Sequence, residues 1–227
     1  MSAYLIINIL IIIVPLLFTF EKKVNYFKKL PNVFTAVISV GAAFILWDIS
    51  AVRNGDWSFN PAYVSGSRIS GLPPEEILFF ITVPYSIIFI YESLRIYIKE
   101  RMVSVNKLLM MTGILIFGTA SYLFSDLSYT SNVMIAAMVV LILLLLKGRS
   151  VDITNIFFIT LLVSFIPFII VNYFLTSMPI LEYNPEAITG IRFLTIPVED
   201  FFYSFSMTGG WLIAYSFSGK RIFFKNN

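Results

Sequence analysis

Residues 60–76 read NPAYVSGSRISGLPPEE, and residues 184–200 repeat this pattern as NPEAITGIRFLTIPVED. The two stretches align without a gap at an offset of 184 − 60 = 124 residues, and six of the aligned pairs are identical. Chance rarely places six identities at one register among residues that are typical of loops. The sequence therefore indicates an internal duplication.

The composition around these stretches is typical of a membrane protein. Of the 227 residues, 58% are hydrophobic and 13% are charged, and the mean hydropathy is +0.86. Seven apolar segments are each near the length that a helix needs to cross about 30 Å of hydrocarbon. They cover roughly residues 3–20, 33–48, 75–94, 108–124, 132–146, 153–175 and 199–218. We expect an all-α, polytopic membrane protein of about seven transmembrane helices.

The basic residues predict how these segments cross the membrane. Thirteen of the 16 lysines and arginines follow the first, third, fifth and seventh segments, among them Lys22, Arg95, Arg149 and Lys225. By the positive-inside rule this face is cytoplasmic, so we expect an integral plasma-membrane protein with its N-terminus outside and its C-terminus inside. The net charge of +3 then reflects topology, and we expect no nucleic-acid partner. The first segment has no preceding basic residue and no small-residue cleavage site, so we interpret it as an anchor.

The offset of the repeat also divides the chain. Four segments separate equivalent points of the two copies, so both copies lie on the same face of the membrane. We expect an N-terminal repeat over residues 1–107, a connecting span within residues 108–131 and a C-terminal repeat over residues 132–227. Parallel three-helix repeats of this kind imply a pseudo-two-fold axis along the membrane normal, with a site between the halves.

Each copy ends in two adjacent acidic residues, Glu75–Glu76 and Glu199–Asp200. Acidic residues after a proline are ordinary chemistry for the start of a helix, so capping is one interpretation. However, both copies keep two acids at the edge of hydrocarbon, where carboxylates are costly and usually functional. Two acids so close together cannot easily both ionise, and such a pair can divide into an acid and a base.

Aromatic residues follow these acids by one helical turn. Glu75 lies four residues before Phe79, so the carboxyl group and the ring share a helix face, and Glu199 repeats this arrangement. The candidate rings are Phe79, Phe80, Phe202 and Tyr203. Aromatic faces stabilise a nearby cation, although such rings can also simply pack against lipid. An acid beside a cation-stabilising ring suits a protonation that creates a carbocation.

Six further polar residues come in pairs that are 124 residues apart. They are Arg68 and Arg192, Asn60 and Asn184, and Asp48 and Asn172. The arginines either hold a carboxylate ionised or anchor the loops at the lipid headgroups. The asparagines of the loops precede proline and indicate turns. The last pair either hydrogen-bonds the acids or caps its own helices.

Several kinds of chemistry lack their residues in this chain. It has no Cys and no His, which excludes disulfides, thiolate metal sites and histidine bases. It also has no G-x-G-x-x-G, no P-loop and no D-x-x-x-D motif. No lysine lies within an apolar segment, so a retinal Schiff base is not available. We expect no cofactor and no metal.

PPEEILFF at residues 73–80 and PVEDFFYS at residues 197–204 resemble the paired motifs of the membrane-integral lycopene beta-cyclases. In that family the two halves are separate subunits or one fused chain with a connecting helix, and this chain resembles the fused form. The second copy departs from the first in Asp200 and in Tyr203–Ser204. It therefore remains open whether the two halves contribute equally.

The resemblance implies an isomerase (an intramolecular lyase) of carotenoid biosynthesis that converts lycopene end groups to beta rings, giving gamma-carotene and beta-carotene. By carry-over, Glu75 and Glu199 are the preferred acids, and Glu76 and Asp200 act as partner, base or cation stabiliser. The partners would be membrane lipids, a carotenoid that enters from the bilayer, and other enzymes of carotenoid biosynthesis.

Two alternatives remain. One is a cyclase of C45 or C50 carotenoids or of another ring type, which product analysis would separate. The other is a proton-coupled membrane transporter. Transporters place acids near the middle of the membrane, whereas these acid pairs lie at the ends of their segments.

Overall fold

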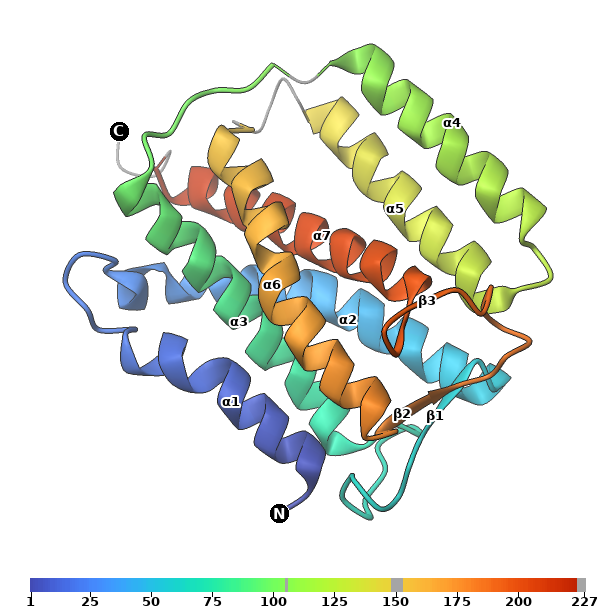
Figure 1. Ribbon diagram of the computed structural model, residues 1–227. Helices are drawn as coiled ribbons and strands as arrows, with labels where there is room; N and C mark the ends of the chain where they lie inside the picture. Colours follow the sequence, from blue (N-terminus) through green and yellow to red (C-terminus); the bar gives the residue numbers. More distant parts are fainter. Residues whose placement is uncertain (105, 148–152, 224–227) are drawn as a thin grey trace.

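The computed structural model describes residues 1–104, 106–147 and 153–223, and within them the chain forms seven α-helices (Figure 1). These are α1 (Ala3–Leu17), α2 (Leu30–Asn54), α3 (Pro74–Tyr97), α4 (Lys107–Leu123), α5 (Ser128–Lys147), α6 (Asn155–Ser177) and α7 (Val198–Phe223). A short 3-10 helix, Tyr26–Lys29, leads into α2. Each predicted segment falls on one helix, so the all-α prediction is confirmed.

Helix lengths agree with a polytopic membrane protein. In the described part of the chain, four helical stretches are long and apolar enough to cross a membrane: Tyr26–Asn54, Pro74–Tyr97, Ser128–Leu146 and Asn155–Ser177. Helices α1 and α4 are also apolar but have only 15 and 17 residues. Helices α2 and α7 continue beyond their predicted apolar segments, because a helix that leaves hydrocarbon can still run through the headgroup region.

The helices pack in pairs that correspond between the two halves. Helix α1 packs against α3, and α5 packs in the same way against α7. Helix α2 crosses to pack mainly against α7, and α6 crosses to pack against α3 (Figure 1). Helix α4 packs against α5 at the edge of the bundle. Each half therefore supplies one helix to the packing of the other half.

The two repeated loops meet at one end of the bundle. Strand β1 (Trp57–Phe59) pairs antiparallel with β2 (Leu181–Tyr183), and Ser58 lies opposite Glu182, its counterpart 124 residues later. The flanking backbone bonds are also reciprocal, because the Asn60 N–H donates to Ile180 and the Asn184 N–H donates to Asp56. A second, smaller pair, β3 (Arg192–Phe193) and β4 (Ile196–Pro197), leads into α7. The β1–β2 pair is thus locally symmetric about Ser58 and Glu182.

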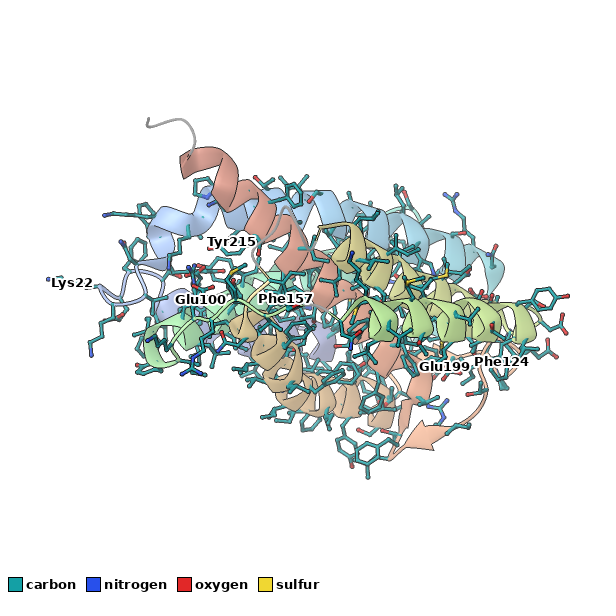
Figure 2. All side chains as sticks on the ribbon, turned by 90° about the horizontal axis from the view of Figure 1, so that it is seen from above. Lys22, Glu100, Phe124, Phe157, Glu199 and Tyr215 are labelled. Atoms are coloured by element: carbon teal, nitrogen blue, oxygen red, sulfur yellow. The ribbon has the colours of Figure 1, made fainter. Side chains whose placement is uncertain are left out.

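The opposite end of the bundle carries the basic loops. Figure 2 shows Lys22 at one end and Glu199 towards the other. At the basic end the Glu92 side chain is 2% exposed, and it accepts hydrogen bonds from Lys29, from Arg95 at 3.1 Å and from Tyr215 at 2.8 Å. This ionic cluster ties α3 to α7. Arg149 and Lys225, which contributed to the predicted topology, lie outside the described residues.

Candidate active site

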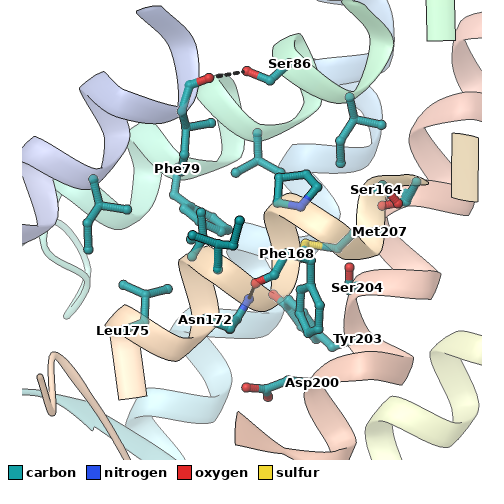
Figure 3. A pocket seen from close by; sticks show the side chains of 18 of the residues that line it. Phe79, Ser86, Ser164, Phe168, Asn172, Leu175, Asp200, Tyr203, Ser204 and Met207 are labelled. Carbon is teal, nitrogen blue, oxygen red and sulfur yellow. Dashed lines mark hydrogen bonds between the residues drawn. The ribbon is translucent and has the colours of Figure 1, made fainter. Parts of the chain in front are cut away.

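A cavity of about 490 Å³ lies between the two halves and reaches the end that carries the repeated loops (Figure 3). Its volume is in the range typical of small-molecule sites. Most of its wall is apolar and comes from faces of α1, α3, α6 and α7. The acidic and phenolic groups on this wall are Asp48, Glu76, Asp200, Tyr4, Tyr129, Tyr183 and Tyr203. The acidic and phenolic groups therefore interrupt a wall that is otherwise mainly apolar.

Glu76 and Asp48 form a carboxyl pair in this wall. The two carboxyl groups are neighbours on the cavity wall, and they are 8% and 2% exposed. The Tyr4 hydroxyl donates to Glu76 at 2.6 Å, and the Tyr203 hydroxyl donates to Asp48 at 2.9 Å. Two carboxyl groups that are buried beside each other cannot easily both ionise. The pair is therefore suited to hold a proton at the cavity wall.

Asp200 has a different environment. Its carboxyl group is 3% exposed, and it accepts hydrogen bonds from the Tyr129 hydroxyl at 2.7 Å and from the Tyr183 hydroxyl at 2.9 Å. Burial, and then the neighbouring Asp200 carboxyl, raise the pKa of Tyr183 well above its ordinary value, so this phenol keeps its proton and donates a hydrogen bond. A carboxyl group that only accepts hydrogen bonds is suited to the ionised form.

The first acid of each pair binds its own loop instead. Glu75 accepts hydrogen bonds from the Ser65 N–H at 2.7 Å, from the Ser65 hydroxyl at 2.9 Å and from the Ser2 hydroxyl at 2.6 Å. Glu75 is not among the residues that line the cavity. Its position fastens the loop to the start of α3.

Glu199 repeats this arrangement at the start of α7. It accepts from the Thr189 N–H and hydroxyl, both at 2.7 Å, and from the Thr130 hydroxyl at 2.8 Å. The carry-over prefers Glu75 and Glu199 as acids, whereas the geometry favours their neighbours Glu76 and Asp200. Adjacent residues on a helix point about 100° apart, and here only the second acid of each pair lines the cavity.

In each copy, one of the two candidate rings lines the cavity and the other does not. Phe79 and Tyr203 line the cavity. Tyr4 lies 6.1 Å from the Phe79 ring, and Tyr129 lies 6.2 Å from the Tyr203 ring, measured between centroids. Phe80 and Phe202 do not line it: Phe80 packs with Phe44 of α2, and Phe202 packs with Phe117 of α4.

The loop residues have local partners. Arg68 donates to the Ser65 carbonyl at 2.7 Å, and Arg192 donates to the Thr195 carbonyl at 2.6 Å. Within the described ranges, no ion pair joins either arginine to an acid. Both arginines therefore bind the backbone of their own loops.

Two asparagines form turns, as their position before proline predicts. The Oδ1 atoms of Asn60 and Asn184 accept from the backbone two residues later, both at 3.0 Å. Asn172, the counterpart of Asp48, does line the cavity, and its amide donates to the Phe168 carbonyl at 3.3 Å. The second half therefore has an amide where the first half has a carboxyl group.

Sequence reasoning missed three tyrosines that donate to the acids, namely Tyr4, Tyr129 and Tyr183. Tyr4 and Tyr129 are 125 residues apart, one more than the main offset, so a search without gaps does not align them. Both nonetheless occupy the same place, because their N–H groups donate to Tyr63 and to its counterpart Ala187. The weak signal for Tyr183 was its alignment with Phe59.

Comparison with known proteins identifies a family. No curated protein and no solved structure matches the chain. One family model, described as lycopene cyclase, matches residues 1–94 and 126–218. The two matched segments begin 125 residues apart and end 124 residues apart, close to the offset of the repeat. Because these segments cover most of the chain, it belongs to the lycopene cyclase family.

Proposed function

We propose that this protein is a lycopene beta-cyclase, an isomerase that closes the end groups of lycopene to beta rings without a cofactor. The observation that carries the proposal is the set of three carboxyl groups, Asp48, Glu76 and Asp200, on the wall of an apolar cavity. A carotenoid is itself apolar and would enter from the bilayer. Its end group would meet acids in a place that bulk water does not fill.

The reaction adds one proton to the substrate and later removes one proton from it. A proton adds to the terminal double bond of the end group and leaves a tertiary carbocation. The neighbouring double bond attacks this cation, which forms the new ring bond and moves the positive charge into the ring. A base then removes a proton from a carbon next to the cation. The electron pair of that C–H bond becomes the ring double bond. The product has the composition of the substrate, so no oxidant or reductant takes part.

The geometry supports a division of labour between the acids. The Asp48–Glu76 pair, whose two buried carboxyl groups cannot easily both ionise, is the proposed proton donor. Asp200, which accepts hydrogen bonds from two tyrosines, is the proposed base. The rings of Phe79 and Tyr203 lie in the same wall and would stabilise the cation between the two steps.

Pigment analysis in bacteria that accumulate lycopene tests this function. With the chain present we expect a two-ring carotenoid, which chromatography and mass spectrometry identify as an isomer of lycopene. A one-ring product would show that the second end is not processed. Unchanged lycopene, with the protein detected in the membrane, would contradict the proposal. A longer carotenoid substrate and then proton-coupled transport would be tested next.

We also propose that the repeated loops face outwards and the basic loops face the cytoplasm. The chain has no Cys, so a single introduced cysteine can be labelled without background. A cysteine at Ser67, which is exposed and does not bind Glu75, should react with an impermeant maleimide on intact cells. A cysteine at Lys23 should react only after the membrane is opened. The reverse pattern would overturn this topology.

A further inference from the structure

The cavity is asymmetric although the fold is nearly symmetric. Six residues of α1 and eight of α6 line it. From their counterparts, α5 and α2, the lining described for the cavity includes only Tyr129 and Asp48. The cavity therefore extends from the acids into the space between α1 and α6, and not into the equivalent space between α5 and α2.

This extension is open towards the surroundings of the bundle. Four lining residues are also strongly exposed: Leu10 (66%) and Val14 (55%) on α1, and Ile170 (55%) and Phe174 (47%) on α6. We call the gap marked by these four residues the α1/α6 opening. All four are apolar, as is normal for a surface that contacts lipid chains.

The cavity is long as well as open. On α3 its lining runs from Glu76 to Ile90 and recurs every three or four residues, so it follows one face of the helix. Fourteen steps of helix correspond to about 21 Å, which is most of the roughly 30 Å thickness of hydrocarbon. A groove of this shape, with acids at one end, fits a molecule whose reacting end is followed by a long apolar tail.

A tryptophan occupies the equivalent gap on the other side. Trp47 of α2 corresponds to Val171 of α6, 124 residues later, and Val171 lines the cavity. The Trp47 ring lies 5.1 Å from the Tyr203 ring of α7 and 6.4 Å from the Tyr129 ring of α5. Its indole therefore bridges α2, α7 and α5, whereas the smaller valine leaves the corresponding space free.

We propose that the α1/α6 opening is the route by which a linear carotenoid enters, and that its polyene tail lies in the groove between α1, α3 and α6 while one end group meets the acids. This inference rests on the proposed function, and it adds the route and the number of sites. A single route to one set of acids means that each binding event processes one end. The one-ring intermediate must leave and return with its other end first.

Closing the opening tests this route. Val171→Trp places in α6 the residue that fills the equivalent gap, and we expect lycopene conversion to fall at least tenfold. The matched control is Ile166→Trp, on the same helix but at a residue that is 63% exposed and outside the cavity lining. That variant should convert lycopene within twofold of wild type. Wild-type conversion by Val171→Trp, at an equal amount of protein in the membrane, would overturn the route.

A binding measurement separates the route from the chemistry and does not depend on how Val171→Trp folds. A diazirine-bearing amino acid is placed at Ile170 or, as a control, at Leu115 of α4, which is 71% exposed and does not line the cavity. Both are made in the Glu76→Gln background and illuminated in membranes that contain lycopene. We expect coloured carotenoid to be attached at 170 and not at 115. Attachment at neither position, or equally at both, would contradict the route.

The two proposals fail in different ways. If the wild-type chain does not convert lycopene but the probe at Ile170 captures it, the groove binds a carotenoid and the proposed reaction is wrong. If the wild-type chain converts lycopene, the probe captures none and Val171→Trp remains active, the reaction stands and the route is wrong.

Discussion

Replacing Glu76 with glutamine should reduce lycopene conversion by about 10²-fold or more, the usual cost of losing a general acid. Glutamine has nearly the shape of glutamic acid and can still accept the hydrogen bond of Tyr4. It cannot transfer a proton to a double bond. We expect the variant to reach the membrane in normal amount and to leave lycopene unchanged in the pigment assay.

The neighbouring Glu75→Gln variant is the matched control. Glu75 holds the Ser65 loop and does not line the cavity, so its neutralisation should weaken the loop more than the chemistry. We expect faster proteolysis of the loop and a smaller loss of conversion than in Glu76→Gln. The opposite order would return the role of acid to Glu75, as the family carry-over suggests.

Asp48→Asn should also lose about 10²-fold in conversion, although Asp48 belongs to neither acidic motif. Asparagine can still accept the Tyr203 hydroxyl, so the packing of the site is conserved. Its amide would, however, donate to Glu76 and favour the ionised form of that group. The proton that the carboxyl pair holds would then be missing, which is a different defect from a loss of structure.

The solvent isotope effect distinguishes these two defects. If proton delivery limits the residual activity of Asp48→Asn, conversion in membranes suspended in deuterium oxide should slow more than it does for wild type. Asn172→Asp, the mirror change in the second half, adds a carboxyl group without removing the pair and should retain most conversion. Wild-type activity in Asp48→Asn would show that Glu76 does not need its partner.

The sequence predicts the helices well and their neighbours poorly. Hydropathy locates each apolar segment because the membrane requires about the same length of helix every time. It does not show that α2 packs against α7 of the other half, since that choice depends on side chains that are far apart in the sequence. The β1–β2 pair was not predicted at all, because strands of three residues carry little pattern.

The site was predicted only in part, because sequence patterns do not show how side chains pack. The repeat identified the acid pairs and the Asp48–Asn172 pair. Which of two adjacent acids faces a cavity depends on the rotation of the helix against its neighbours, and only packing sets that rotation. Tyr4 and Tyr129 were lost to a one-residue shift in register, although their hydroxyls are direct partners of Glu76 and Asp200.

The crossing of α2 and α6 also bears on how such a protein could have evolved. If the ancestor was a half-length chain that paired with an identical copy, it had two equal grooves and two equal sets of acids. After fusion, each copy was free to change alone. A tryptophan at position 47 then filled one groove, and an asparagine at position 172 replaced one carboxyl group. Two ordinary substitutions would thus have turned a symmetric dimer into a molecule with one open groove and one closed groove.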